Sequence, residues 1–185
     1  MAAVIGIGTP VTAIADNVQV LTIPSVVVPS GTNLALIVSF GYYNRSRSAL
    51  SVTYNGVALT KRRRKDNGSA AATSEVWFLA NPPATTDDVV ITLDAASGSG
   101  AEVVGTATPY TFLDQTTPIE ADNGGTVVTG SHTSHSGSVT PLTAGALIVD
   151  HLLYIFCGDA ATSVGSQTER SHRYGTNIGL ETSTR

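Results

Sequence analysis

The strongest structural signal in the chain is the segment Ser51-Val52-Thr53-Tyr54-Asn55-Gly56-Val57-Ala58-Leu59-Thr60. Its Asn55-Gly56 pair separates two short runs in which apolar and polar residues alternate. A type I′ turn requires positive φ at both central residues, and Asn-Gly is among the pairs that meet this requirement best. The segment therefore predicts a tight antiparallel β-hairpin.

Short apolar runs separated by turn residues continue along most of the chain. In residues 33–43, alternate side chains from Leu34 to Tyr42 would share one face of a long strand. Pro24 and Pro29 restrict residues 26–28 to an edge strand or a linker, because proline cannot donate to a sheet ladder. Further strands are predicted at residues 17–23, 74–79, 88–93, 102–108 and 146–156.

The run at 146–156 is nearly continuous in apolar residues, which favours a central strand that is buried on both faces. Residues 114–145 are expected to form a long connection with short strands at 126–128 and 137–140. Residues 163–185 are expected to form a polar tail with an apolar patch at 178–180. The candidate core residues are Leu36, Val38, Phe40, Trp77, Leu152 and Phe156.

These patterns predict an all-β fold, because no segment longer than a turn has convincing helical periodicity. We expect a single antiparallel β-sandwich, jelly-roll-like, with about nine or ten strands and negligible helix. We divide the chain into an extended N-terminal arm, residues 1–15, and a sandwich domain, residues 16–185. The uncharged arm either packs on the sandwich or extends onto a neighbouring subunit as an added strand.

Charge is scarce and unevenly placed. Charged residues make up 13% of the chain and the net charge is −4, yet five of the ten basic residues form the run Lys61-Arg62-Arg63-Arg64-Lys65. Binding along a nucleic acid is not expected, because it requires an extended basic face. The run either contacts an acidic protein surface or is a solvated hairpin end that keeps an exposed edge strand from aggregating. Because Lys61 and Arg63 would point inward in a continuing strand, we expect the strand to end near Thr60.

Signals for chemistry are weak, and we expect no catalytic residue, no metal ligand and no cofactor. His132 and His135 have metal-ligand spacing, but no third ligand is evident nearby. Asp150 and His151 are adjacent in a predicted strand, so their side chains would point to opposite faces. The single cysteine, Cys157, is expected to be a small buried hydrophobic residue. No apolar stretch reaches the roughly 18 residues of a membrane helix, and the N-terminus lacks the basic start of a secretory signal.

Three stretches together resemble a β-sandwich family of tailed-phage structural proteins. They are the segment 51–60, then Glu75-Val76-Trp77-Phe78-Leu79-Ala80-Asn81-Pro82-Pro83-Ala84, and then Asp114-Gln115-Thr116-Thr117-Pro118-Ile119. The resemblance spans residues 15–170 and implies a jelly-roll-like domain of virion decoration, fibre or tail-appendage proteins, with no catalytic motif. Domains of this kind close with further strands after a segment like 163–184. We expect the arm or a neighbouring subunit to supply them, unless the chain is truncated.

We therefore expect a virion structural protein and not an enzyme: a phage capsid decoration (cement) protein, made in the host cytoplasm. Its partners would be the major capsid protein or other virion proteins, and it would form a homo-oligomer, with a trimer favoured, without binding membrane. The candidate interface residues are Val4, Ile5, Ile7, Lys61, Arg62, Arg63, Arg64 and Lys65. The alternative is a tail fibre or appendage protein, or a carbohydrate-binding receptor-recognition module, which would expose two or three aromatic rings side by side.

Overall fold

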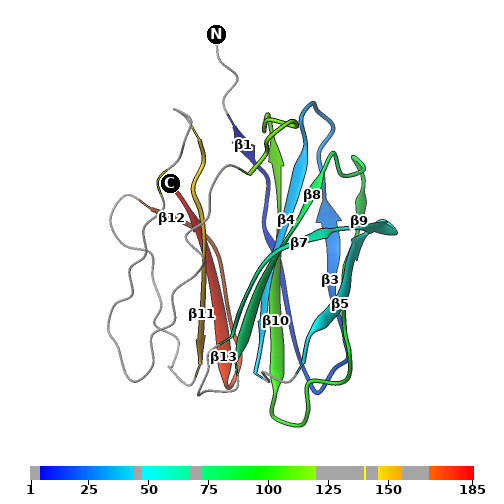
Figure 1. The fold of residues 1–185 in the computed structure, drawn as a ribbon, viewed down its shortest axis with the longest axis vertical. Coiled ribbons are helices and arrows are strands. Elements are labelled where there is room, and N and C mark those ends of the chain that lie inside the picture. The colour runs from blue at the N-terminus through cyan, green and yellow to red at the C-terminus, as the bar shows by residue number, and fades with distance from the viewer. Residues whose placement is uncertain (1–4, 44–46, 67–71, 120–139, 141–145, 156–166) are drawn as a thin grey trace.

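Three antiparallel sheets make up the described part of the chain (Figure 1). The structure is a computed structural model, and it describes residues 5–43, 47–66, 72–119, 140, 146–155 and 167–185. The strands are β1 (Gly6–Ile7), β2 (Val11–Asp16), β3 (Val20–Val27), β4 (Ala35–Tyr42), β5 (Ala49–Tyr54), β6 (Val57–Ala58), β7 (Thr60–Asp66), β8 (Thr73–Ala80), β9 (Thr86–Leu93), β10 (Glu102–Thr111), β11 (Val149–Ile155), β12 (Thr168–Tyr174) and β13 (Ile178–Thr184). The described residues contain no helix, so the prediction of an all-β sandwich is confirmed.

Sheet A, with the order β1-β10-β4-β8-β7 and with β2 also paired to β10, lies in the middle of the molecule (Figure 1). Sheet B, with the order β3-β9-β5-β6, packs on one face of sheet A. Sheet C, with the order β11-β13-β12, packs on the opposite face. The sandwich of sheets A and B therefore carries a third layer.

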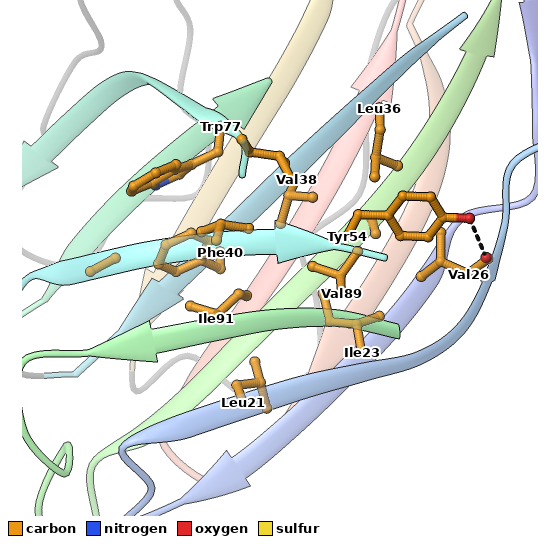
Figure 2. Close-up of a cluster of buried hydrophobic side chains, with 14 of the residues drawn as sticks. Leu21, Ile23, Val26, Leu36, Val38, Phe40, Tyr54, Trp77, Val89 and Ile91 are labelled. Atoms are coloured by element: carbon orange, nitrogen blue, oxygen red, sulfur yellow. Dashed lines mark hydrogen bonds between the residues drawn. The ribbon is translucent and has the colours of Figure 1, made fainter. Parts of the chain in front are cut away.

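The main core lies between sheets A and B (Figure 2). Alternate residues of β4, from Leu36 to Tyr42, are fully buried there, as the period-two pattern predicts. The Tyr54 hydroxyl is a donor within hydrogen-bond distance of the carbonyl oxygens of Val26, at 3.2 Å, and Thr85, at 2.6 Å. Of the predicted core residues, Leu36, Val38, Phe40 and Trp77 are buried, Leu152 is half-buried, and Phe156 lies outside the described residues.

The predicted hairpin is confirmed. Asn55 has φ of 47° and Gly56 has φ of 72°, and β5 pairs with β6 across this turn. After Leu59 the chain leaves sheet B and enters sheet A as β7, so this segment joins the two layers of the sandwich.

Strand β3 is an edge strand of sheet B, and its pairing is irregular at Pro24. The register of β3 on β9 shifts between Ile23 and Val26, and Ser25 has φ of 54°. A β-bulge of this kind accommodates Pro24, which has no N–H to donate. The alternative of an edge strand is therefore the correct one for this segment, although the strand extends without interruption from Val20 to Val27.

Sheet C corrects two expectations. The apolar run at 146–156 was predicted to be a central strand, but among the described strands β11 lies at an edge of sheet C and most of its residues are only half-buried. The central strand is β13, in the segment expected to be a polar tail, and all seven of its residues are buried. Its inward residues Ile178 and Leu180 pack against Val104 of β10, and this contact accounts for the burial of these two side chains.

The interface between sheets A and C is more polar than the main core. Thr106 of β10 lies 3.1 Å from the Ser171 hydroxyl of β12, which in turn lies 2.7 Å from the Thr182 hydroxyl of β13. Glu102 accepts hydrogen bonds from the backbone N–H groups of Thr176, at 2.9 Å, and Asn177, at 2.7 Å. This carboxylate thereby fastens the β12–β13 turn to the start of β10.

The N-terminal segment is not separate from the sandwich in the part that the structure describes. Residues 11–16 form β2, and Gly6 and Ile7 form β1, and both strands pair with β10 of the same chain. Ile5 and Ile7 pack against a small cluster that contains Ala35, Phe78 and Tyr110. The extended arm of our domain division therefore belongs to sheet A from residue 6 onward, because the edge of β10 provides hydrogen-bonding partners within the chain.

Candidate functional site: a basic edge strand

The basic run forms strand β7, which lies at one edge of sheet A. The hairpin strand does end near Thr60, with β6 at Ala58, but the chain then continues as a new strand, β7, which pairs with β8 as far as Asp66. The register on β8 shifts between Lys61 and Arg63, which leaves Arg62 as the extra residue of a bulge. The bulge changes which cations share a face, so that Lys61 and Arg64, rather than Lys61 and Arg63, point inward.

The inward cations meet a carboxylate that is completely buried. The Lys61 Nζ lies 3.0 Å from the Glu75 Oε2, and the Arg64 Nη1 lies 4.0 Å from the Glu75 Oε1. The Glu75 side chain has no solvent exposure, whereas the Lys61 and Arg64 side chains remain 33% and 26% exposed. A buried charge is tolerated only when it is paired and hydrogen-bonded, and these two cations supply the pairing.

Neutral donors complete the surroundings of Glu75. Its Oε1 accepts a hydrogen bond from the Tyr42 hydroxyl at 2.9 Å and from the Ala49 backbone N–H at 3.3 Å. Its Oε2 accepts a hydrogen bond from the Trp77 indole N–H at 2.9 Å. Burial raises the pKa of Tyr42 above its ordinary value, and the neighbouring Glu75 charge raises it further. Tyr42 therefore stays protonated and available as a donor.

Lys61 has two further contacts that fix its position. Its Nζ lies 5.0 Å from the centre of the Trp77 ring, in cation–π geometry. The same Nζ lies 3.4 Å from the carbonyl oxygen of Ala49, on strand β5 of sheet B. Lys61 thus connects the edge strand to both layers of the sandwich.

The far end of β7 is held by Asp66. The Thr73 hydroxyl donates to the Asp66 Oδ1 at 2.7 Å, and the Arg64 Nε lies 3.1 Å from the same oxygen. The remaining cations of the run point away from this cluster: Arg62, Arg63 and Lys65 are exposed, and Arg62 and Lys65 have no ion pair with any other described residue. β7 consequently presents positive charge along an exposed edge.

The other candidate interface residues belong to the N-terminal segment and do not join this site. Ile5 and Ile7 are half-buried against the cluster around Tyr110, at the opposite edge of sheet A. Val4 lies outside the described residues. The structure therefore separates the five basic residues of β7 from Ile5 and Ile7.

The contact between Ser74 and His151 is a candidate catalytic arrangement. The Ser74 hydroxyl lies 3.5 Å from the Nδ1 and 3.4 Å from the Nε2 of the ring, so it is aimed at neither nitrogen. The neighbouring Asp150 is exposed and accepts a hydrogen bond from the Gln167 side chain at 3.0 Å. Burial lowers the pKa of His151 to about 4, although the Asp150 charge acts in the opposite direction. The arrangement lacks the aligned acid, base and nucleophile of a hydrolytic triad.

Metal binding finds no support among the residues that can be placed. No group of three His, Cys, Asp or Glu residues with metal-binding geometry occurs in the described part of the chain. His132, His135 and Cys157 all lie outside that part. No helix among the described residues is long and apolar enough to cross a membrane.

Comparison of the chain with protein-family models, curated proteins and solved structures found no match. The resemblance to phage β-sandwich proteins therefore stays a prediction, and the functional argument rests on the geometry of β7 and its surroundings.

The role of Glu75 and the course of β7 were missed by the sequence reasoning. Glu75 alternates with Trp77 and Thr73 in a strand whose buried face could be predicted, so a carboxylate at that position requires cationic partners. The lysines and arginines nearest to Glu75 in the sequence are those of the run at 61–65. This argument would have placed the run beside β8.

Proposed function

We propose that this chain is a structural protein of a virus particle, acting as a capsid decoration protein that binds other particle proteins through its surface and catalyses no reaction. The observation that carries the proposal is β7, an edge strand with five consecutive basic residues in a chain of net charge −4. Such a concentration of one charge favours a partner surface of the opposite charge.

The support for a binding role comes from how β7 is held. Two of its cations are committed to the buried Glu75, and the outward ones are thereby presented on a strand that cannot move freely. Preorganised groups lose less conformational entropy when they bind.

The support for a virion role comes from the three resembling stretches. They fall on the β5–β6 hairpin, on β8 with its Asn81-Pro82-Pro83 end, and on the loop after β10. The first two flank β7 in sequence. The β5–β6 hairpin connects β7 to sheet B, and β8 is the strand that pairs with β7. The resemblance and the binding edge thus concern the same region of the molecule.

Carbohydrate binding receives less support than protein binding. It requires aromatic rings exposed side by side, but Tyr42, Tyr54, Trp77 and Tyr110 are buried. The half-buried Tyr154 and Tyr174 do form a pair, with ring centres 6.2 Å apart, but the Tyr154 ring packs against Gly179 between them. The Tyr154 ring therefore covers part of the middle strand of sheet C.

The test is sedimentation of the purified chain with shells of the encoding phage that lack it. We expect saturable binding of the wild-type chain that weakens as the salt concentration rises, because charge pairs at a surface are screened. The variant Arg62→Glu/Lys65→Glu should bind weakly, and the control Arg173→Glu/Arg185→Glu, with the same change in net charge at exposed positions, should bind like wild type. Failure of the wild-type chain to sediment with shells at low salt would refute the proposal.

A further inference from the structure

We propose that β7 receives an extended acidic segment of the partner protein as an additional strand of sheet A. This inference rests on the proposed binding function and specifies the partner chemistry and the mode of contact. It combines three properties of β7: an edge free of any described strand, a fixed extended backbone and a row of positive side chains.

The first property is the unpaired edge. β7 pairs with β8 on one side, and no strand of the described residues pairs with its other side. Every residue of β7 is exposed except Arg64, which is half-buried. The backbone groups on the outer side of an edge strand are hydrogen-bonding partners for an incoming strand.

The second property is preorganisation. Glu75 holds Lys61 near one end of β7 and Arg64 in its second half, and Thr73 holds Asp66 at the other end. A partner segment would therefore meet a strand that is already extended, and most of the ordering cost on binding would fall on the partner alone.

The third property selects the partner. Exposed Arg62 and Lys65 would face like charges if a second copy of β7 paired with the first, and like charges on opposed strands are destabilising. An acidic segment would instead place carboxylates beside these cations. The charges on β7 therefore disfavour pairing between two copies of this strand and favour an acidic partner, as attraction and repulsion together determine specificity.

The test uses a fluorescein-labelled peptide of about seven residues, matched to β7, in which Glu alternates with Val and Thr. We expect saturable binding to the full-length chain by fluorescence anisotropy. In the variant Arg62→Glu/Lys65→Glu the affinity should fall about tenfold or more, and in Arg173→Glu/Arg185→Glu it should change less than about twofold. Thermal unfolding of each variant verifies that it is folded.

A second peptide separates strand addition from simple charge attraction. It has the same sequence, but alternate backbone nitrogens are methylated so that one edge cannot donate hydrogen bonds. Two forms, methylated in the two alternate registers, cover both possible orientations of the donating edge. We expect at least one form to lose most of its binding, whereas equal binding of the parent and both methylated peptides would overturn the inference.

Three further outcomes are decisive. Binding of a single-stranded DNA of similar charge as tightly as the acidic peptide would overturn the inference, because the edge would then recognise charge alone. Sedimentation with shells without any binding of the acidic peptide would also overturn it, while leaving the proposed function intact. Peptide binding without sedimentation would support strand addition and refute the decoration role.

Discussion

One buried carboxylate determines how the basic run behaves. Taking Glu75 out of water is costly, and the cost is offset by two cations and three neutral donors that surround it. The same contacts determine which side chains of β7 point inward. The chemistry of a single residue on β8 therefore sets the character of the neighbouring edge strand.

Replacing Glu75 by Gln should lower the free energy of unfolding by about 2–4 kcal/mol, because Lys61 and Arg64 would then lose their common buried counter-charge. Urea denaturation measures the change. The control Glu169→Gln removes one exposed carboxylate from β12 and should change stability by less than about 0.5 kcal/mol. A Glu75→Gln protein as stable as wild type would show that the cluster contributes nothing to the fold.

The lowered pKa of His151 predicts that the protein loses stability in acid. Because burial lowers its pKa to about 4, the folded chain leaves the ring neutral at a pH where an unfolded histidine, with a pKa of about 6.5, takes up a proton. The unfolded state then binds more protons, so stability falls as the pH falls from about 6.5 to about 4. The ring is half-buried, so we expect a loss of about 1–3 kcal/mol.

The check is the urea midpoint of wild type and His151→Gln between these two pH values. The wild-type midpoint should fall across this window, and the variant should show a distinctly smaller fall, whatever its stability at neutral pH. Equal pH dependence of the two proteins would assign the effect to other groups.

Among the elements, those with strict alternation could be predicted from the sequence. The pattern from Leu34 to Tyr42 gave β4 and its buried face, and Asn55-Gly56 gave the hairpin, because each signal is local. The segment 168–184 was missed because Arg, Glu and Thr dilute its apolar content. The burial of Ile178 and Leu180 in β13 comes from packing on sheet A, which no local pattern encodes.

The packing of sheet C on sheet A depends on a close approach of β4 and β11. A Cβ on Gly41 would clash with the Leu153 side chain, so Gly41→Ala should cost about 1–3 kcal/mol. In a Leu153→Ala background the same substitution should cost much less, with a coupling energy of at least about 1 kcal/mol.

Urea denaturation of the four proteins of this cycle measures the coupling. Gly31→Ala is the control, since a Cβ there would make only ordinary contacts with Leu34 and Thr111. Additive effects of Gly41→Ala and Leu153→Ala would contradict the packing of sheet C against β4.

For the whole molecule, the sequence predicted the fold class and showed the basic run, but it did not predict where in the fold the run lies. The charges at 61–65 were noticed because they are contiguous, yet their place in β7 depends on Glu75, which is on another strand. The sequence left open whether the N-terminal segment packs on the sandwich or extends onto a neighbour, and in the structure its described part pairs with β10 of the same chain. Pairings between distant strands are set by the assembled sheets, and a single sequence carries little trace of them.

The central claim is that the molecule acts by contact through β7. Hydrogen–deuterium exchange of the chain, free and bound to shells of the encoding phage, tests it most directly, because amides that gain partners exchange more slowly. We predict new protection in residues 60–66, and none at the exposed Arg173 region of β12. Stable binding with unchanged exchange in residues 60–66 would contradict the account.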